Sequence, residues 1–146
     1  MNQTTNYSLN QWEATDRVTR ADFNADNTKI DAALKAVANA AGAAPKFAVG
    51  SYTGNGAATR TISVGFTPKA VFVVESRGHM ADDCASLAQR FYYGGLAVTG
   101  SPVKTRGDDV LVEIAAGGFT VHYLANGNYY GWANTQNYTY HYVALG

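Results

Sequence analysis

A change of hydrophobic period near residue 45 constrains the fold more than any other feature of the sequence. Before it, over residues 23–41, one stripe of residues recurs at alternating spacings of four and three, which is the period of an amphipathic helix. After it, apolar and polar residues alternate in short runs, which is the period of β-strands. Gly42 and Pro45 stand between the two patterns and favour the end of a helix. We therefore predict a helical stalk, residues 1–45, followed by a β domain, residues 46–146.

The stalk is predicted to be helical over residues 10–41 and to associate with copies of itself. Thr19 and Asp22 have the spacing of a capping box, and a shorter helix or a turn precedes them. A narrow stripe like this one is typical of a coiled coil, in which a single polar residue fixes the register. The alternative is an amphipathic helix that folds back onto its own domain. The stripe, which is the expected oligomer interface, consists of Phe23, Asn27, Ile30, Leu34 and Val37.

The β domain is predicted to be an antiparallel β-sandwich of six to seven strands, which makes the protein mainly β. Turn signals separate the apolar runs, and no second helix is indicated. Gly117-Gly118 predicts a tight hairpin turn, and Gly94-Gly95 predicts a bulge or bend. Alternation in one strand places Val110, Val112 and Ile114 toward the core. The predicted strands are 47–53, 59–64, 70–75, 90–98, 110–115, 119–123 and 138–145.

Two of these strands lack a solvent face, which indicates a further partner for the sheet. Residues 70–75 form a continuous apolar run. In residues 138–145 tyrosines occupy one face, while His141 and Val143 lie on the other. One face of such a strand contacts the core, so the other is expected to contact another subunit. We therefore predict an oligomer built around the sheet, with His141 and Val143 in its interface.

Charge and cysteine content exclude several classes of partner and site. The chain has eleven basic and eleven acidic residues, so it lacks the basic excess that nucleic acid or an anionic membrane surface requires. Cys84 is the only cysteine, which excludes an intrachain disulfide. The first residues lack the features of a signal peptide, and no apolar run is long enough to span a bilayer. We expect a protein that is made in a cytosol, binds no nucleic acid and inserts into no membrane.

The sequence contains no recognisable motif for catalysis, for a cofactor or for a metal ion. It has no Gly-x-Ser-x-Gly elbow, and the turn at residues 54–56 lacks the lysine and the helix of a phosphate loop. Asp82-Asp83 and Asp108-Asp109 lack the ligand-rich loop that calcium requires. A pair of carboxylates for glycoside hydrolysis is conceivable, but no spacing argues for it. We therefore expect a protein that is not an enzyme and that has neither a cofactor nor a metal site.

Binding is the function that the last third of the chain favours. No charged residue follows Glu113, and residues 126–137 are rich in Asn, Gly, Tyr and Trp. Carbohydrate is recognised by aromatic rings that pack on sugar C–H groups and by amides that form hydrogen bonds with sugar hydroxyls. The same side chains also suit a protein partner. The loop at residues 76–89 adds charged groups. The candidate ligand contacts are Tyr129, Tyr130, Trp132, Asn134, Asn137, Arg77, His79, Asp82 and Asp83.

The end of the sandwich that carries the site stays open at this stage. If the strands simply alternate in direction, residues 54–59 and 76–89 lie at the end away from the stalk, and residues 126–137 lie on the stalk side. One extra strand within residues 84–98 would reverse the direction of every later strand, so residues 126–137 would then lie at the end away from the stalk.

Two stretches resemble the tail-fibre or receptor-binding proteins of phages and prophages of Gram-positive bacteria. Asn10-Gln-Trp-Glu and residues 22–34 resemble the N-terminal stalk of such proteins, and residues 54–74 resemble the sandwich that follows it. The sandwich is also similar to the H-type lectin fold. The shared features are Phe66-Thr-Pro before an apolar strand, Gly118-Phe119 at a strand start, Trp132 and Asn134 in a loop, and an aromatic–aliphatic last strand.

The resemblance implies a six-stranded sandwich that assembles as a homotrimer and binds sugar near the subunit junctions. It implies the receptor-binding tip of a virion tail, which binds a cell-surface glycan multivalently without catalysis and joins other tail proteins through its N-terminal segment. The sugar-contacting residues of the lectins have no one-to-one match here, and Ala133 stands where a histidine is expected. The alternative is a structural connector or decoration protein whose aromatic loop docks another tail component. A third hypothesis is an enzyme that acts on surface polysaccharide.

Overall fold

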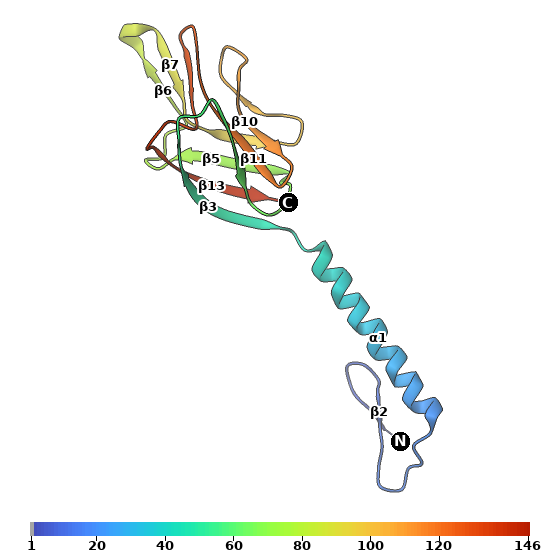
Figure 1. Ribbon diagram of the computed structural model, residues 1–146. Helices are drawn as coiled ribbons and strands as arrows, with labels where there is room; N and C mark the ends of the chain where they lie inside the picture. The colour runs from blue at the N-terminus through green and yellow to red at the C-terminus, as the bar shows by residue number, and fades with distance from the viewer. Residues whose placement is uncertain (1) are drawn as a thin grey trace. The chain divides into compact units, whose positions relative to one another are not determined.

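A computed structural model describes residues 2–146, which form two compact units. The first unit, residues 2–44, contains the single α-helix of the described chain (Figure 1). The second, residues 45–146, contains two β-sheets. Strands account for 43% of the residues and helix for 19%, so the fold is mainly β, as predicted.

Helix α1, Arg20–Ala43, begins at the predicted capping box. Thr19 is the N-cap: its hydroxyl accepts a hydrogen bond from the Asp22 N–H at 3.3 Å, and the Asp22 carboxylate accepts one from the Thr19 N–H at 3.2 Å. These bonds satisfy backbone donors that have no partner within the helix. The start of α1 is thus determined by residues that are close together in the sequence.

Residues 10–19 are not helical, so the predicted helix start at residue 10 is wrong. Strand β1, Asn2–Gln3, instead pairs antiparallel with β2, Asn10–Gln11. The backbone N–H of Asn10 donates to both carboxylate oxygens of Asp26, at 3.1 and 3.0 Å. Asp26 is buried. Contacts between residues that are distant in the sequence therefore hold this segment extended, and a local helical pattern does not encode them.

The N-terminal hairpin packs along α1, with Tyr7 and Leu9 bordering Ile30 and Leu34, but the predicted stripe stays largely exposed. The Lys29 ammonium donates to the carbonyl oxygen of Ser8 and lies 3.4 Å from the Asp26 carboxylate, so it ties the hairpin to the helix. The apolar residues of the stripe are 42–65% exposed: Phe23, Ile30, Leu34 and Val37. The single chain thus has a largely exposed apolar seam, which is a requirement for a self-associating helix.

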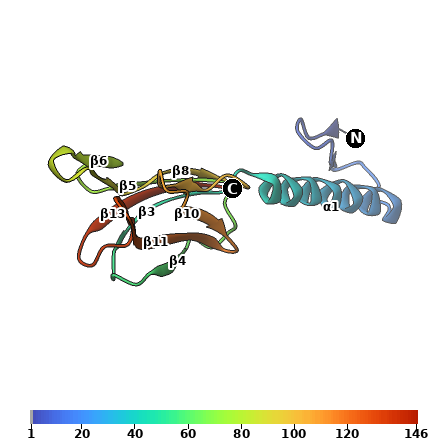
Figure 2. The ribbon, with the colours of Figure 1, turned by 90° about the horizontal axis from the view of Figure 1, so that it is seen from above.

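The second unit contains eleven strands in two sheets, which pack face to face (Figure 2). One sheet has the order β3-β13-β5-β8. The other has the order β6-β7-β12-β11-β10-β9, with β4 paired to β11. The strands are β3 Phe47–Thr53, β4 Thr59–Ser63, β5 Ala70–Glu75, β6 Ala81–Cys84, β7 Gln89–Tyr92, β8 Gly95–Val98, β9 Val103–Lys104, β10 Val110–Ala115, β11 Gly118–Asn126, β12 Tyr129–Trp132 and β13 Thr139–Leu145.

The prediction of six to seven strands, all antiparallel, is too simple. The segments expected to be loops contain β6, β9 and β12, and a 3-10 turn, Ala85–Leu87, connects β6 to β7. Strands β7 and β12 pair in parallel, whereas the other strand pairs of this unit are antiparallel. Strands of two to four residues are too short to show a periodic pattern, which is why the sequence does not reveal them.

Gly94 marks a crossing between the two sheets. The single strand predicted over residues 90–98 is in fact two strands, with β7 in the seven-stranded sheet and β8 in the four-stranded sheet. A Cβ at Gly94 would lie 2.1 Å from the carbonyl oxygen of Val73, so only glycine permits this close approach. The predicted hairpin turn shifts by one residue, because Gly118 already pairs with Ala115 as the first residue of β11.

The core lies between the two sheets. Val71, Val73 and Tyr140 enter it from the four-stranded sheet, and Phe119 and Val121 enter it from the other; none of the five has exposed surface. Rings of Tyr52 and Tyr140 stack with their centroids 5.0 Å apart, and Tyr52 meets Phe119 edge-on at 6.2 Å. Aromatic side chains therefore fill much of the space between the sheets.

The predicted inward pattern of β10 is confirmed for two of its three residues: Val112 is buried in the core, and Ile114 is half-buried and packs against it. Val110 is half-buried outside this group, and Leu111, which was not predicted inward, has no exposed surface. The pairing of β10 with β9 shifts register between Val110 and Val112. Leu111 is covered on the other face of the sheet, near Leu124. Both faces of β10 are thus buried in part, and a simple alternation does not describe it.

Candidate functional site

The two segments predicted to carry the site meet in one three-stranded part of the sheet. Asp83 of β6 pairs with Arg90 of β7, and Arg90 pairs in turn with Tyr129 of β12. We call β6, β7 and β12 the tip; it lies at the end of the β domain away from Pro45, where the chain enters (Figure 1). The extra strands β6 and β7 change the order expected from simple alternation and bring both segments to this end.

An aromatic cluster lies on one face of the tip. Trp132 is at its centre, with its ring centroid 4.5 Å from Phe91, 6.0 Å from Tyr93, 6.3 Å from Tyr130 and 6.5 Å from Tyr138. The rings of Phe91 and Tyr130 also stack on each other at 5.0 Å. Tyr93 is buried, and the other four residues are half-buried. The aromatic cluster is therefore a packed group that still presents accessible ring surface.

Two buried tyrosines fix the backbone at Trp132. The Tyr52 hydroxyl donates to the carbonyl oxygen of Ala133 at 2.6 Å, and the Tyr140 hydroxyl donates to the carbonyl oxygen of Trp132. The Tyr140 hydroxyl also accepts from the N–H of Thr135 at 3.2 Å. Burial raises the pKa of both Tyr52 and Tyr140, so both phenols stay protonated and can donate at neutral pH. Side chains of the core thus hold Trp132 in place.

Asn134 is a structural residue, so its prediction as a ligand contact is wrong. It has no exposed surface. Its side-chain nitrogen donates to the side-chain oxygen of Asn55 at 2.7 Å and to the carbonyl oxygen of Ala57 at 2.8 Å. These bonds fix the loop between β3 and β4 and leave the amide out of reach of a surface ligand. Asn137 is exposed in the turn next to Tyr138 and remains a candidate.

Arg77 stands beside the aromatic cluster because a buried carboxylate holds it. Glu75, 3% exposed, accepts hydrogen bonds from the Arg77 N–H at 3.1 Å, from Arg77 Nε at 3.2 Å and from the Ser76 hydroxyl at 3.0 Å. Burial alone would raise the pKa of Glu75, but these hydrogen bonds outweigh it and lower the pKa. The Arg77 guanidinium lies 6.0 Å from the ring centroid of Tyr138, within range of a cation–π contact.

Further polar groups complete a rim around the aromatic cluster. The ring centroid of His79 lies 6.3 Å from that of Tyr93. Burial raises the pKa of Tyr93, and the nearby charge of Asp82 adds to this effect. The Gln89 amide donates to the Tyr130 hydroxyl at 3.1 Å. Gln89 was not predicted from the sequence, because only the pairing of β7 with β12 brings it to Tyr130.

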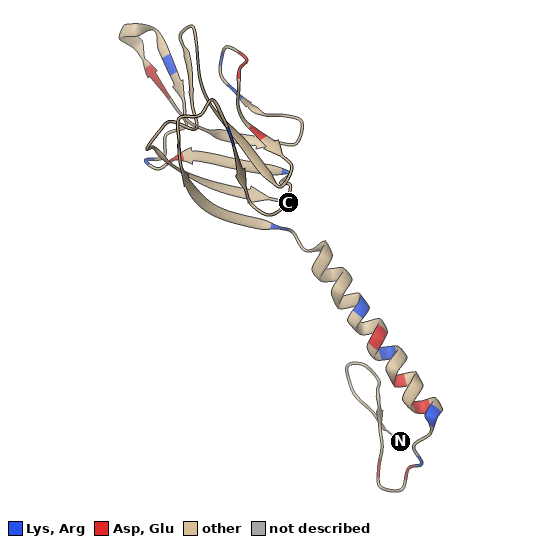
Figure 3. Cartoon of the chain, viewed as in Figure 1, with Lys and Arg blue, Asp and Glu red and all other residues tan. Residues whose placement is uncertain are grey.

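Tyr129 and Asp83 lie on the opposite face of the tip. Successive side chains of a strand alternate, so the neighbours of Tyr130 and Asp82 point away from the aromatic cluster. Asp83 forms a two-point ion pair with Arg90 there, and Figure 3 shows the opposite charges on β6 and β7. The predicted ligand contacts are therefore divided between two faces of the tip, and no single ligand surface contains all of them.

The two residues of β13 predicted at the interface between subunits, His141 and Val143, lie on the outer face of the four-stranded sheet. His141 is exposed and Val143 is half-buried. Strand register places Val143 in a row of apolar residues that runs across the four strands, next to a second apolar row. We call the two rows together the outer apolar face. Its rows are Val49, Val143, Phe72 and Leu96, and Phe47, Leu145, Ala70 and Val98.

The outer apolar face is uncovered in the single chain. Phe47, Val49 and Leu96 are 61–63% exposed, and no charged residue occupies the eight positions. Only the β5 and β13 part of this surface was predicted, because β3 and β8 look like ordinary alternating strands with one solvent face. Their side chains form a continuous apolar surface only once β13 and β5 lie between them.

Residues 2–146 contain no group of three or more His, Cys, Asp or Glu side chains placed to hold a metal ion. No helix in this range is both long and apolar enough to cross a membrane. The chain was compared with protein-family models, with curated proteins and with solved structures. None of them matches. Its function is therefore inferred from the residues at these surfaces.

Proposed function

We propose that this chain is the receptor-binding tip of a phage tail fibre or phage-like particle, and that it binds a cell-surface glycan without catalysis. The observation that carries the proposal is the half-exposed aromatic cluster centred on Trp132, with its polar rim. Ring faces of Trp132 and Tyr130 suit the apolar C–H surface of a sugar ring. Arg77, Asp82 and Gln89 supply donors and acceptors for its hydroxyl groups.

The anchoring of Trp132 supports a binding role. Tyr52 and Tyr140 fix the backbone of Trp132 and Ala133 from within the core, so little conformational freedom is lost when a ligand binds. Glu75 restrains Arg77 in the same way. A rigid surface of this kind favours binding of a sugar, which offers few strong contacts of its own.

Two uncovered apolar surfaces, one in each unit, support assembly as a homotrimer. The first is the stripe on α1, where Asn27 would align the helices of neighbouring copies. The second is the outer apolar face, a contiguous patch of a kind that monomeric proteins rarely expose. Since the outer apolar face carries no charge, a second copy of this chain suits it better than a charged partner. The three-fold symmetry itself comes from the resemblance to trimeric lectins and phage proteins.

In a homotrimer, the mechanism of attachment is multivalent. Three weak sites on one rigid particle reach an avidity far above the affinity of one site, provided that the geometry lets them engage together. The N-terminal hairpin and α1 would join the tip to other tail proteins, so the protein would be located in the virion tail. In this assignment the two units have separate roles, one in assembly and one in recognition.

A structural connector is the alternative, because an aromatic surface also suits a protein partner. A glycan array probed with the purified full-length chain, together with binding to intact cells, separates the two functions. We expect binding to a defined glycan and its loss in Tyr130→Ala, since this half-buried ring stacks on Phe91 and packs beside Trp132. The matched control is Leu87→Ala, which removes an exposed apolar side chain from the same end of the domain.

The outcomes of this experiment are distinct. Binding to no glycan and no cell, together with tight binding to another tail protein, would refute the glycan function and favour the connector. Release of sugar from cell-wall polysaccharide would instead identify an enzyme. Equal glycan binding by Tyr130→Ala and the wild type would remove the aromatic cluster as the site.

A further inference from the structure

A surface pocket lies mainly on the face of the tip that is turned away from the aromatic cluster, and Gln89, which bonds Tyr130 of the cluster, also lines it. It encloses about 270 Å³. Its walls come from the β6–β7 hairpin, from β12 and from the turn between β9 and β10. Two arginines and one carboxylate supply its charge: Arg90, Arg106 and Asp83, with Tyr129 beside them. We call it the arginine pocket.

The turn between β9 and β10 places Arg106 at the arginine pocket. The N–H of Thr105 donates to the carbonyl oxygen of Asp109 at 2.9 Å, which closes the turn. A Cβ at Gly107 would lie 3.1 Å from the Tyr129 ring, so the turn packs directly against that ring. Arg106 therefore reaches the pocket from a defined turn that is separate in the sequence from β6, β7 and β12.

Arg106 contributes a positive charge that the pocket does not neutralise. Within residues 2–146, its guanidinium makes no hydrogen bond and no ion pair. Asp83, the one carboxylate of the pocket, is already paired with Arg90 at two points. The hydrogen bond from Arg90 lowers the pKa of Asp83, and the charge of Arg106 adds to this effect. Two guanidinium groups and one carboxylate leave the pocket with one excess positive charge.

We infer that the arginine pocket binds an oxyanion, a carboxylate or a phosphate carried on a sugar, through Arg106 and Arg90. The fork of N–H donors on arginine matches the paired oxygens of either group. The Tyr129 ring provides a wall on which the sugar can pack. A cation would be repelled by the excess positive charge, and a neutral sugar would leave Arg106 without a partner.

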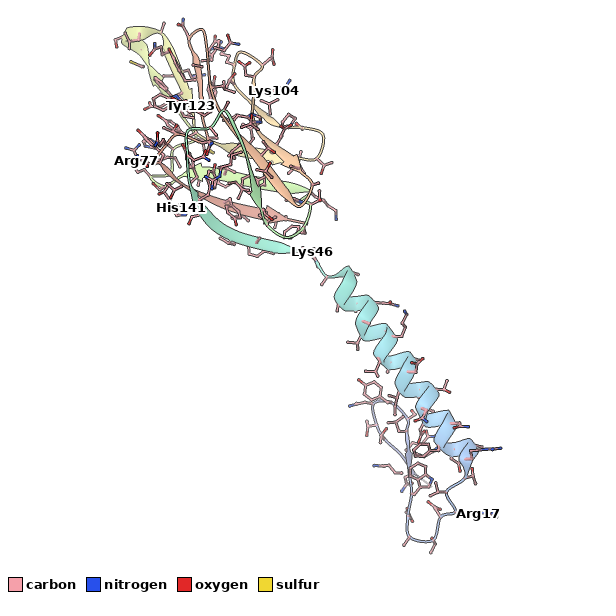
Figure 4. All side chains as sticks on the ribbon, in the orientation of Figure 1. Arg17, Lys46, Arg77, Lys104, Tyr123 and His141 are labelled. Carbon is pink, nitrogen blue, oxygen red and sulfur yellow. The ribbon has the colours of Figure 1, made fainter. Side chains whose placement is uncertain are left out.

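This inference rests on the proposed function and makes it more specific, because it names a charged saccharide as the receptor class. Phe91 and Tyr130 of the aromatic cluster alternate along the same strands with Arg90 and Tyr129 of the arginine pocket, and Gln89 borders both, so the two sites would bind different units of one polymer. Figure 4 shows Arg77, at the rim of the cluster, and Lys104, at the start of the β9–β10 turn, on opposite sides of the β domain. The two sites can therefore be tested separately.

The test uses the full-length chain, labelled with ¹⁵N and titrated with three probes in NMR spectra. The probes are glucuronate, glucose 6-phosphate and the neutral methyl glucoside. We expect at least one charged probe to shift the amide signals of Arg90, Gly107 and Tyr129, whereas methyl glucoside should shift only the indole N–H signal of Trp132. The binding of the charged probe should weaken with added salt, because exposed charges are screened.

Arg106→Gln should weaken binding of the charged probe about tenfold, since one charge-assisted contact is lost. Arg17→Gln is the matched control: it removes the same charge from an exposed arginine of the other unit. Arg106 is exposed and unbonded, so its variant should unfold at the wild-type temperature. Equal binding by both variants, or no shift at the pocket with either charged probe, would overturn the inference.

The probes also distinguish failure of this inference from failure of the proposed function. A shift of the Trp132 indole with methyl glucoside, without any pocket shift, refutes the oxyanion site and leaves glycan binding in place. A pocket shift that depends on Arg106, in a protein that binds no glycan array and no cell, supports the oxyanion site while the proposed function fails.

Discussion

The hydroxyl of Tyr52 on β3 donates a hydrogen bond to the carbonyl oxygen of Ala133, 81 residues away in the sequence. The two residues belong to different parts of the sandwich, and the bond crosses its buried interior. Through it, the side chain of the first strand of the domain fixes the backbone directly after Trp132, the centre of the aromatic cluster. The candidate binding surface is therefore attached to the core and does not depend on the stiffness of a loop.

Replacing Tyr52 with phenylalanine should weaken both the fold and ligand binding. Tyr52→Phe leaves the buried Ala133 carbonyl without its donor, which costs about 1–3 kcal/mol of the free energy of unfolding. Urea denaturation followed by Trp fluorescence measures this loss. Tyr7→Phe is the control, because the Tyr7 side chain is 57% exposed. An unchanged unfolding midpoint in Tyr52→Phe would show that the bond to Ala133 does not stabilise the domain.

Glu75 should make the stability of the β domain depend on acid pH. Burial acts to raise its pKa, but hydrogen bonds from Arg77 and Ser76 lower it below the ordinary value of 4.5. A carboxyl with a lowered folded-state pKa stabilises the fold above the pKa of the unfolded chain. That stability is lost as the pH falls through the folded-state pKa.

The melting temperature of the wild type and of Glu75→Gln should therefore be measured between about pH 2 and pH 7. We expect the difference between them to be largest near neutral pH and to shrink below pH 4.5. Asp31→Asn is the control, since Asp31 is an exposed acid on α1. A difference that stays constant over the whole range would show that the charge of Glu75 has no part in stability.

Gly94→Ala should destabilise the sandwich strongly. Its Cβ would lie 2.1 Å from the Val73 carbonyl oxygen, so the backbone that crosses between the sheets would have to move. Steric changes of this kind in a buried position cost about 2–4 kcal/mol. Gly42→Ala is the control, because a Cβ there has no atom within 4 Å. Alanine favours a helix interior over glycine by about 1 kcal/mol, so this control should not destabilise the chain.

A charge on the outer apolar face should dissociate the proposed oligomer. Val49→Asp places a carboxylate at the β3 end of an uncharged row, and burying it against another copy would be strongly unfavourable. Sedimentation velocity should then show a smaller species, with loss of avidity for cells. Ser63→Asp, on the exposed side of β4, is the control. If the wild type sediments as a monomer, or if Val49→Asp sediments like it, the outer apolar face is not an interface.

The sequence specified several features correctly because they depend on neighbouring residues. Thr19 and Asp22 fix the start of α1 through bonds that span three positions. Strands of five to seven residues, such as β3, β5 and β13, show their alternation or continuous apolar character directly. Tyr130 and Trp132 were named as candidate contacts from the residue types of a segment expected to be a loop, and only the strand β12 shows that the two share one face.

Features that depend on distant residues were missed. Asn134 looks like an exposed polar loop residue, and only its bonds to Asn55 and Ala57 show that it is buried. Residues 10–19 were predicted to be helical, but Asn10 is bonded to Asp26 and Asn10–Gln11 form one strand of a hairpin. Asp83 and Tyr129 were predicted as ligand contacts, but the arginine pocket that they line was not, because Arg106 comes to it from a turn that has no motif.

By itself, the sequence determined the order of the two units, the boundary between helix and strands, and the residue types available for recognition, because these follow from local periodicity and composition. The tertiary structure decided which of those residues meet. The parallel pairing of β7 with β12 brings Phe91 to Tyr130 on one face of the tip and Arg90 to Tyr129 on the other. Strand pairing is set by packing across the whole domain, so no local pattern reports it, and the division of the candidate site into two faces became visible only in the folded chain.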